Sequence, residues 1–429
     1  MSAEFIIIFL AFVSLLFLSV PIAVVIGISA ALAIWATGGE CFEVVATSMA
    51  QGVDSFALLA IPFFILSGAI MGRGAMAIKL INLATALVSP FPGGLAYVNT
   101  LTCMFFGAIS GSSVAAVSSV GSFMIPQMEK KGYGKEMPIA LTVCSSTTGM
   151  LIPPSNTMIV YSVAVGGVSI GALFIAGIIP GILLGIAILC VSIVYAKRNK
   201  IKAEGKFEPK KILKAFKEAF LSLMLIVIVL GGILGGIFTA TEAAVIAVVY
   251  AFVLEVFVYR DISMRQMYEI LYDSARVTGV VMLIVGASTA MSWIMTMTNI
   301  PQQIAEAMSI LGDSKIAILI TINIILLFVG MFMDMTPAIL IFTPIFLPIV
   351  SQLGISAIHF GIIMITNLSI GLCTPPVGTC LFVGCGVGKS DIGSVSPKLI
   401  PYVIGMIAAL LFITFIPALS EWLPKVCKL

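Results

Sequence analysis

Long apolar runs separated by short polar turns make up most of the chain. Three of them, Phe5–Leu18, Ala219–Phe238 and Ile400–Pro417, contain no charged residue. Runs of this kind are typical of helices that cross a membrane. Because hydrocarbon offers the backbone no hydrogen-bond partner, the pattern predicts helices rather than an open sheet. We therefore predict an all-α integral membrane protein that crosses the bilayer many times.

The composition supports this class of protein. Of the 429 residues, 60% are hydrophobic and 10% are charged, whereas a soluble domain is about a quarter charged. The N-terminal run lacks a basic segment and is too long for a signal peptide, so we expect it to be retained. The eight cysteines contain no CxxC pair and are expected to be packing residues.

The sequence disfavours enzymatic chemistry. His359 is the only histidine, so no histidine cluster is available to bind a metal, and no GxxxxGK[ST] loop is present to bind ATP phosphates. An embedded enzyme would need a nucleophile with its base, or a metal centre. We expect no enzymatic activity, no organic cofactor and no nucleic-acid partner; the bilayer itself is the expected environment.

The sequence contains an internal repeat, in which glycines and prolines of the first half recur at a constant offset in the second half. The matching positions are Pro126 and Pro348, Gly132 and Gly354, Gly149 and Gly371, Pro153-Pro154 and Pro375-Pro376, Thr157 and Thr379, Gly166 and Gly388, and Gly171 and Gly393. This many coincidences in one register indicate a duplication.

The placement of lysines indicates that the two copies are inverted. A loop with Lys130, Lys131 and Lys135 follows Pro126 in the first copy, whereas the matching loop, Ser351–Phe360, contains no Lys or Arg. Because short loops rich in Lys and Arg stay in the cytoplasm, the two loops are expected on opposite sides of the membrane.

A lysine-rich central segment fixes the orientation. Its cations are Lys197, Arg198, Lys200, Lys202, Lys206, Lys210, Lys211, Lys214 and Lys217. With this segment in the cytoplasm, Leu221–Phe238 is predicted to run outward, Ala243–Tyr259 to return and Val277–Thr298 to run out again. Inversion then requires residues 4–36 to form two short spans that meet near Ser19–Pro21, with both termini outside. The total is about ten crossings and two hairpins.

Two segments are too long for loops, yet they begin and end on the same side. Gly93–Gln127 has the polar turn Ser110–Ser113 halfway, and Lys315–Pro348 has Asp334–Pro337 near its middle. Each segment predicts a helical hairpin that enters and leaves the membrane on one face.

Each hairpin is followed by a span that we expect to be broken near mid-membrane. The breaks are Gly149–Thr157 and Gly371–Thr379, and both are built around Pro-Pro. Proline removes a backbone donor and clashes with the preceding turn, so carbonyl groups are left unpaired. At membrane depth this is tolerated only where they line a cavity or hold an ion. Hydroxyls and carbonyls suit Na⁺, and half-helix N-termini suit an anion.

Three charged features leave two interpretations each. Asp334, the one acid of a long apolar stretch, is either a cation ligand or the N-cap of the second hairpin helix. Glu242, which follows Thr239, is expected to cap a helix rather than to take part in transport. Lys210–Ser222 is either an amphipathic helix on the cytoplasmic membrane surface or a charged linker.

Together these features resemble the large membrane subunit of the tripartite ATP-independent periplasmic (TRAP) transporters, within the ion-transporter superfamily. The resemblance covers essentially the whole chain and is most specific at Gly107–Ser113, Pro153–Asn156, Thr239–Ala243 and Gly371–Pro376. The third segment departs from the family at Ala240, where a proline is usual. The sequence as a whole is most similar to the sialic-acid branch.

The resemblance implies Na⁺-coupled uptake of an organic acid across the bacterial inner membrane by an elevator mechanism. The acid would be a sialic acid such as N-acetylneuraminate before a C4-dicarboxylate, delivered by a periplasmic substrate-binding protein. A small four-helix membrane subunit, expected as a separate chain, would complete the scaffold. Residues 1–92, 168–314 and 391–429 would form the scaffold and the C-terminal span, and residues 93–167 and 315–390 the transport domain.

Carried over by position, the resemblance implies two Na⁺ sites with the substrate carboxylate between them. The first Na⁺ site would comprise Ser110, Gly111, Ser112, Ser113, Gly149, Ser155, Asn156 and Thr157. The second would comprise Asp334, Met335, Thr336, Gly371, Thr374, Pro375, Gly378 and Thr379. The substrate would contact Ser112, Pro154, Asn156, Pro337 and Pro376.

Two other kinds of transport protein are alternatives. A stand-alone Na⁺/dicarboxylate symporter of the same superfamily would need no partner. A channel would need a continuous polar lining, whereas the polar residues here cluster at two inverted places, which favours alternating access.

Overall fold

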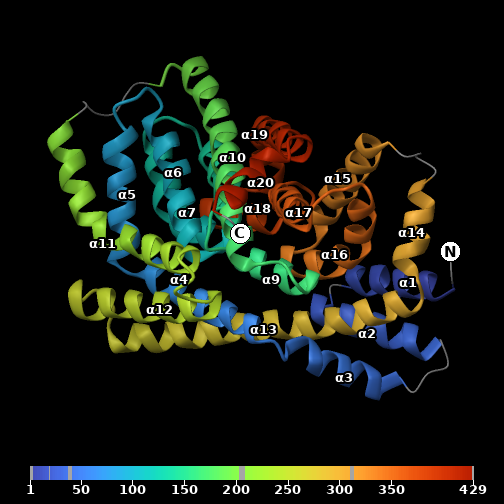
Figure 1. Cartoon of the computed structure of the whole chain (residues 1–429). Coiled ribbons are helices and arrows are strands. Elements are labelled where there is room, and N and C mark those ends of the chain that lie inside the picture. The colour runs from blue at the N-terminus through green and yellow to red at the C-terminus, as the bar shows by residue number, and fades with distance from the viewer. Residues whose placement is uncertain (1–2, 19, 37–40, 202–207, 310–313, 428–429) are drawn as a thin grey trace.

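The computed structural model describes residues 3–18, 20–36, 41–201, 208–309 and 314–427, and every regular element in them is a helix (Figure 1). The first half contains α1 (Ala3–Phe17), α2 (Ile22–Ala36), α3 (Cys41–Val53), η1 (Phe56–Leu59), α4 (Ala60–Arg73), α5 (Ala75–Val88), α6 (Gly94–Ser110), α7 (Ser113–Lys130), α8 (Glu136–Ser146), η2 (Thr147–Met150), α9 (Asn156–Val165) and α10 (Ile170–Arg198). The second half contains α11 (Pro209–Leu234), α12 (Ala240–Phe252), the π-helical η3 (Val253–Val258), α13 (Met264–Met297), α14 (Ile300–Ser309), α15 (Lys315–Phe332), α16 (Met335–Gln352), α17 (Ala357–Gly371), α18 (Thr379–Gly388), α19 (Ile392–Phe415) and α20 (Ala418–Val426).

The structure confirms the duplication. At the offset that relates the repeated prolines and glycines, α7 coincides end for end with α16, and α9 and α10 match α18 and α19. The two copies also exchange packing partners. Helix α7 packs on α18 while α16 packs on α9, and α8 packs on α19 while α17 packs on α10. Such an exchange is what two copies related by a two-fold rotation produce, and an axis in the membrane plane makes the copies inverted.

Both hairpins and both broken helices form where the sequence predicts them. Hairpin 1 is α6 and α7, and hairpin 2 is α15 and α16. Broken helix 1 is α8 with η2, interrupted after Met150 and resumed at Asn156 in α9. Broken helix 2 is α17, interrupted after Gly371 and resumed at Thr379 in α18.

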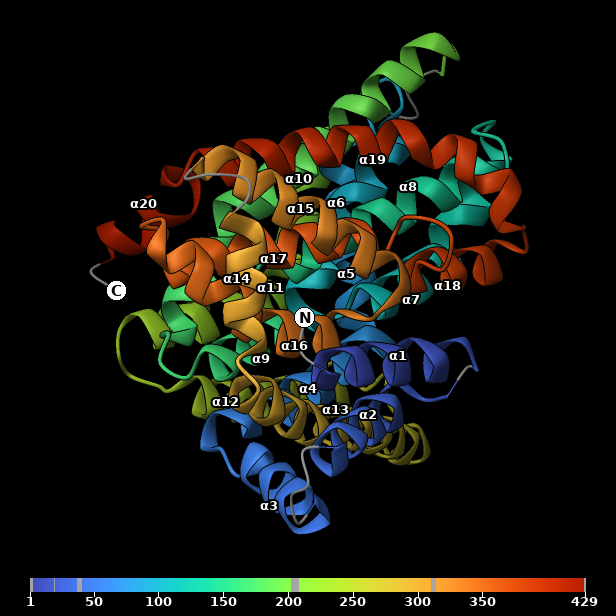
Figure 2. The ribbon, with the colours of Figure 1, turned by 90° about the vertical axis from the view of Figure 1, so that its right-hand side faces the viewer.

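Several of the remaining helices form a layer beneath these elements (Figure 1). In Figure 1, α4, α12 and α13 cross the lower part of the view, and α4 packs against both of the other two. Figure 2 shows α2, α3 and α13 gathered at the same edge in the turned view, where α13 packs on α2 and α3. Helix α11 packs along α5. We call this layer, together with α5 and α11, the scaffold.

The N-terminal segment agrees with the prediction of two short spans. Helices α1 and α2 pack on each other, and the predicted break at Ser19–Pro21 falls between them, although Ser19 itself lies outside the described residues. Eight helices within the described ranges are long and apolar enough to cross a membrane. The total of about ten crossings stays a prediction.

Two predicted boundaries were wrong. The span expected at Val277–Thr298 begins at Met264 instead, as part of the 34-residue helix α13. Its first turns were missed because the charges of this stretch recur at helical spacing on one face and lower the local hydropathy. The amphipathic segment Lys210–Ser222 is helical, but it is the first part of α11 and continuous with the following span rather than a separate helix.

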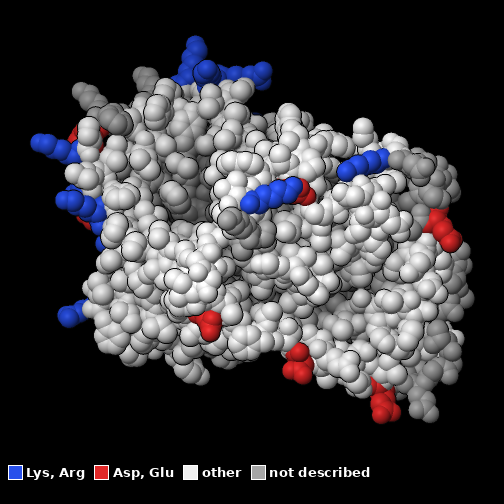
Figure 3. Space-filling view, viewed as in Figure 1, with Lys and Arg blue, Asp and Glu red and all other residues white. Residues whose placement is uncertain are grey.

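Most of the visible positive charges lie at one side of the molecule. In Figure 3, Lys and Arg gather at the left and upper edges, where α10 ends and α11 begins, with a few more near the centre and right, whereas the lower right edge carries Asp and Glu. Short basic loops stay in the cytoplasm. The edge with the end of α10 is therefore the cytoplasmic edge.

A buried carboxylate joins the two scaffold halves at this edge. The N-cap of α5 is Gly74, which has no side chain to accept the first backbone N–H groups of the helix. Glu255 of η3 supplies that acceptor from 180 residues away: its carboxylate accepts hydrogen bonds from Ala75 N at 3.0 Å and Met76 N at 2.8 Å. A Cβ at position 74 would collide with this carboxylate, so glycine is required there.

Replacing Glu255 with Ala is expected to lower the free energy of unfolding by about 2–4 kcal/mol, because two charge-assisted hydrogen bonds are lost and two buried N–H groups are left unpaired. Glu255→Gln retains one acceptor oxygen and is expected to cost less. The measurement is the thermal unfolding midpoint in detergent. Glu218→Ala, which removes an exposed carboxylate from an i,i+4 pair with Lys214, is the control. Equal midpoints for Glu255→Ala and Glu218→Ala would contradict the capping role.

Candidate transport site

The tip of hairpin 1 lies against the start of α9. Gly111 ends α6 in the left-handed region at φ +59°, and Ser112 is the N-cap of α7, accepting a hydrogen bond from Ala115 N at 3.3 Å. A Cβ on Gly111 would lie 3.2 Å from both Asn156 N and Asn156 Nδ2. The polar turn and the polar break therefore meet, as two parts of one proposed ion site must.

Paired glycines bring each hairpin onto its broken helix. A Cβ on Gly149 would overlap the Cα of Gly107, so the backbones of hairpin 1 and broken helix 1 are in direct contact. In the second copy a Cβ on Gly371 would lie 2.5 Å from the Cα of Gly330. These close approaches set the distance between each hairpin and the carbonyl groups of its break.

The tip of hairpin 2 carries Asp334 at the position equivalent to Ser112. Asp334 is the N-cap of α16, and its Oδ1 accepts a hydrogen bond from Met335 N at 2.9 Å. The capping geometry of one interpretation is therefore present. The second carboxylate oxygen remains available for a cation, so the ligand role stays a prediction. At Glu242 the structure shows a full capping box with Thr239, as expected.

Broken helix 2 brings two backbone carbonyl oxygens close to Gly378 at its interruption. Gly378 N donates to Met331 O of hairpin 2 at 3.1 Å. A Cβ on Gly378, which has φ +43°, would lie 2.9 Å from Thr374 O and 3.0 Å from Leu372 O, so these carbonyl oxygens surround a position that only glycine leaves open.

Among the buried side-chain oxygens that lack a hydrogen-bond partner in the described residues, one lies at each break. These atoms are Asn156 Oδ1 in the first copy and Thr379 Oγ1 in the second. Nearby, Ser155 Oγ donates to Met150 O at 2.6 Å and lies 2.7 Å from Thr157 Oγ1. An ion is one of the groups that can satisfy a buried polar atom of this kind. The donor set, neutral oxygens with one carboxylate, fits a hard monovalent cation.

A cavity of about 390 Å³ connects the two hairpin tips. Three helix N-termini face it: α7 with Ser112 and Ser113, α9 with Asn156 and Thr157, and α16 with the segment 334–336. Their partial positive charges favour an anion. The cavity lies beside Arg73, close to the cytoplasmic edge.

The cavity contains only part of the residues that the sequence singled out. The residues that line it are Ser110, Gly111, Ser112, Ser113, Asn156, Thr157, Asp334, Met335 and Thr336. Those that do not line it are Gly149, Ser155, Gly371, Thr374, Pro375, Gly378 and Thr379. Of the prolines expected near the substrate, Pro337 is buried, Pro376 is exposed, and Pro154 faces a small void beside α4 and α11.

The opposite wall of the cavity belongs to the scaffold, and sequence reasoning missed it. This wall consists of α4, from Ile61 to Arg73, and of α13, from Asp273 to Val281. The signal in the sequence was Arg73, which marked the end of an apolar run. Its partner Asp273 lies 200 residues further along the chain, so nothing local indicated that Arg73 faces the same space as the hairpin tips.

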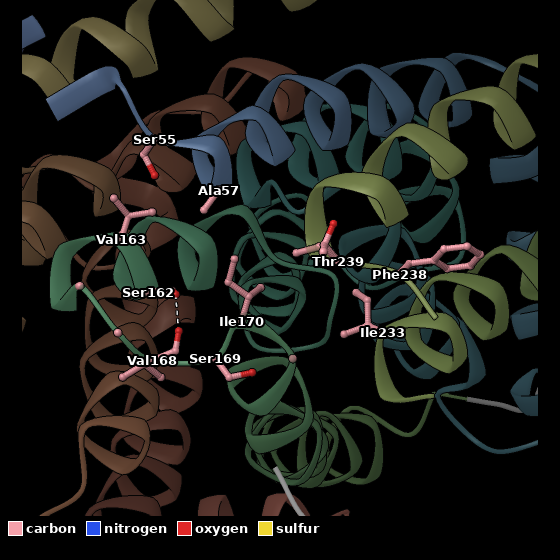
Figure 4. A pocket seen from close by; sticks show the side chains of 14 residues that line it. Ser55, Ala57, Ser162, Val163, Val168, Ser169, Ile170, Ile233, Phe238 and Thr239 are labelled. Carbon is pink, nitrogen blue, oxygen red and sulfur yellow. Dashed lines mark hydrogen bonds between the residues drawn. The ribbon is translucent and has the colours of Figure 1, made fainter. Parts of the chain in front are cut away.

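A second hollow of about 640 Å³ lies at the outer edge (Figure 4). It is bounded by Ser55, by the turn at Thr239, and by the connection between α9 and α10, where Ser162 Oγ donates to Val168 O at 2.5 Å. Among the described residues that line it, none belongs to a hairpin tip. The tips therefore line the cavity beside Arg73 and not this hollow.

Two interlocked repeats whose hairpins and broken helices meet at one cavity define a membrane transporter. Residues 9–419 match the family model of the tripartite ATP-independent periplasmic transporter, DctM component, and the chain belongs to this family. It is a multi-pass protein of the bacterial inner membrane and a transporter permease, not an enzyme. The membership confirms the resemblance seen in the sequence and disfavours the stand-alone symporter.

Curated relatives match over nearly the whole chain. It is 47% identical to the uncharacterized protein YgiK of Salmonella typhimurium, covering 98% of this chain and 97% of that one. It is 42% identical to the isethionate TRAP transporter permease protein DctMQ of Oleidesulfovibrio alaskensis, covering 95% of this chain and 64% of that relative. It is 41% identical to the C4-dicarboxylate TRAP transporter large permease protein DctM of Pseudomonas aeruginosa, covering 93% of each.

A solved structure shares the fold. The YdaH transporter of Alcanivorax borkumensis superposes with a TM-score of 0.62 at 13% identity, covering 98% of this chain and 99% of that one. At this identity the likeness concerns the fold alone.

Proposed function

We propose that this chain is the large permease subunit of a transporter that takes up a small organic anion with Na⁺ by an elevator mechanism. One observation carries the proposal: two hairpin tips and three helix N-termini converge on a single cavity in a chain made of apolar helices. A purely structural kink at each Pro-Pro break is the alternative, and the unpartnered oxygens at both breaks favour an ion there.

Na⁺ is proposed as the coupling ion because of the ligands available. Serine and threonine hydroxyls, backbone carbonyls and one carboxylate surround the two breaks, and these oxygens suit a hard cation. A cation at each break adds positive charge beside the cavity. Na⁺ and the anion thereby favour each other's binding, which is the thermodynamic requirement for coupling.

The elevator movement is supported by the way the parts pack. The two copies interlock, α7 on α18 and α16 on α9, so hairpins and broken helices form one body. The tip of hairpin 1 contacts the scaffold helix α4 at Gly68. A Cβ added to Gly68 would lie 2.7 Å from the Cα of Ser110. A contact surface without a projecting side chain at this point suits one body sliding past the other.

The partners and the substrate class follow from the relatives. The name DctMQ belongs to a relative that is longer than this chain, consistent with a small membrane subunit that works with the large one. We propose such a subunit here, together with a periplasmic substrate-binding protein. The relatives are named for isethionate and for C4-dicarboxylates, both small anions. The overall sequence favours a sialic acid, which is also an organic anion, and we propose it as a further candidate substrate.

The test is uptake into proteoliposomes that contain this chain and its small subunit, with the binding protein outside. Radiolabelled succinate, isethionate and N-acetylneuraminate are offered in parallel under an inward Na⁺ gradient. At least one of them is expected to accumulate, and replacing Na⁺ by K⁺ or omitting the binding protein is expected to abolish accumulation. Equal accumulation with K⁺ would overturn Na⁺ coupling, and equal accumulation without the binding protein would overturn the tripartite assignment.

A further inference from the structure

The scaffold wall of the cavity carries an ion pair that the transport sites do not use. Arg73, the last residue of α4, lies with Nη2 2.5 Å from Asp273 Oδ2 and Nη1 3.6 Å from Glu269 Oε2 of α13. Arg73 and Asp273 both line the cavity. The side chains of all three residues are about half exposed, so the pair faces water rather than the core.

A buried hydroxyl without a partner lines the same cavity as this pair. Ser274 follows Asp273 in α13, lines the same cavity and is 5% exposed, and its Oγ has no hydrogen-bond partner among the described residues. A buried donor of this kind normally finds an acceptor. The wall thus carries a guanidinium group and an unused hydroxyl donor that line one cavity, and both suit an anionic oxygen.

The duplication shows that this pair is not a requirement of the repeated fold. At the offset that relates the two copies, the position equivalent to Arg73 is Met295, and the position equivalent to Asp273 is Gln51. The outer side therefore has no ion pair at the matching place. A feature present on one side only is expected to serve a step that occurs on that side, which here is the exchange of cargo with the cytoplasm.

We propose that Arg73 and Ser274 form an anion subsite at the cytoplasmic mouth of the cavity, which binds the carboxylate or sulfonate of the cargo on its way out. The planar guanidinium group presents paired N–H donors that match such a group. The carboxylate of Asp273 competes with the anion for the guanidinium group of Arg73. When the anion arrives it takes the place of Asp273 on Arg73, and when Asp273 returns the anion is released.

The competition keeps the subsite weak, as an exit requires. Glu269 also faces Arg73, and Arg265 lies 4.0 Å from Glu269, so two acids and two cations balance at the mouth. An uncompensated arginine there would hold the anion and slow its release. The subsite rests on the proposed uptake of an organic anion, because it adds a second binding step to that route.

The first test measures charge selectivity and needs no transport. Ser274→Cys is introduced into a variant without the eight native cysteines, and the purified protein in nanodiscs reacts with methanethiosulfonate reagents. One reagent carries an anionic ethylsulfonate and the other a cationic trimethylammonium group. Peptide mass spectrometry measures the rate at which each reagent modifies the cysteine at position 274. Each rate is divided by the rate of the same reagent with a free thiol in solution. The anionic reagent is expected to react faster.

Three substitutions then assign the selectivity. Arg73→Gln is expected to lower the ratio of anionic to cationic rates roughly tenfold, since one charge beside the reacting thiol is lost. Arg73→Lys keeps the charge and is expected to retain most of the ratio, and Asp273→Asn is expected to raise it. Size-exclusion profiles show that each variant is folded. A ratio unchanged by Arg73→Gln would overturn the subsite.

A second test separates the subsite from the proposed function. In proteoliposomes loaded with succinate, Arg73→Gln is expected to raise the internal half-saturating concentration for efflux roughly tenfold. An unchanged internal value, with the thiol selectivity present, would remove Arg73 from the cargo's route. Absence of Na⁺-driven uptake of any anion by the unmodified chain would instead overturn the proposed function and leave the thiol result standing.

Discussion

Asp334→Asn is expected to raise the half-saturating Na⁺ concentration for uptake about 10- to 100-fold while leaving the protein folded. Loss of one charged ligand contact costs about 1.5–3 kcal/mol, which corresponds to this range. The helix cap survives, because Asn is as good an N-cap as Asp. The hydrogen bond from Met335 N to Asp334 is compatible with both roles of Asp334, as a helix cap and as a cation ligand. The substitution separates these two roles.

The matched control is Asp391→Asn. Asp391 is also an N-cap, accepting from Ser394 N at 2.8 Å at the start of α19, but it is not among the residues that line the cavity. It is expected to leave the Na⁺ dependence unchanged. The measurement is initial uptake rate against Na⁺ concentration at saturating substrate. Equal Na⁺ curves for Asp334→Asn and the unmodified chain would reduce Asp334 to a cap.

The equivalence of Ser112 and Asp334 illustrates what the sequence can predict. The two residues are related by the offset of the repeat, and both cap the second helix of a hairpin. The duplication was visible because glycines and prolines recur where the backbone needs a turn, a break or a close approach. Those requirements are local, so they leave a signature in the chain.

The scaffold wall was not predictable for the opposite reason. The pairing of Arg73 with Asp273 depends on how α4 packs against α13. Hydropathy predicts that a membrane span exists, but it does not predict which helix packs against which face of that span. The same holds for Glu255, whose role exists only because Gly74 lies beside it in the folded chain. Short helices such as α5 and α14 were missed because their apolar runs are too short to count as spans.

Gly149→Ala is expected to abolish most uptake, because the new Cβ would overlap the Cα of Gly107. Backbone cannot move aside as a flexible side chain can, so hairpin 1 must shift away from broken helix 1. The strain is expected to cost about 1–3 kcal/mol of stability. The larger effect is on function, since the tip and the break would no longer be spaced to share one ion. Gly371→Ala tests the same contact in the second copy, where the Cβ would lie 2.5 Å from Gly330 Cα.

Gly386→Ala, in α18 of broken helix 2, is the control. An added Cβ there meets nothing within 4 Å, and the residue lies in α18, where Ala is the better helix former. It is expected to leave uptake and the thermal midpoint unchanged or slightly raised. Uptake by Gly149→Ala at the level of Gly386→Ala would mean that the close approach of the two backbones is not needed for coupling. Loss of uptake in Gly149→Ala with a retained thermal midpoint would instead show that the fold tolerates the added methyl group. The close approach of the backbones would then be required for the spacing of the oxygens at the ion site and not for stability.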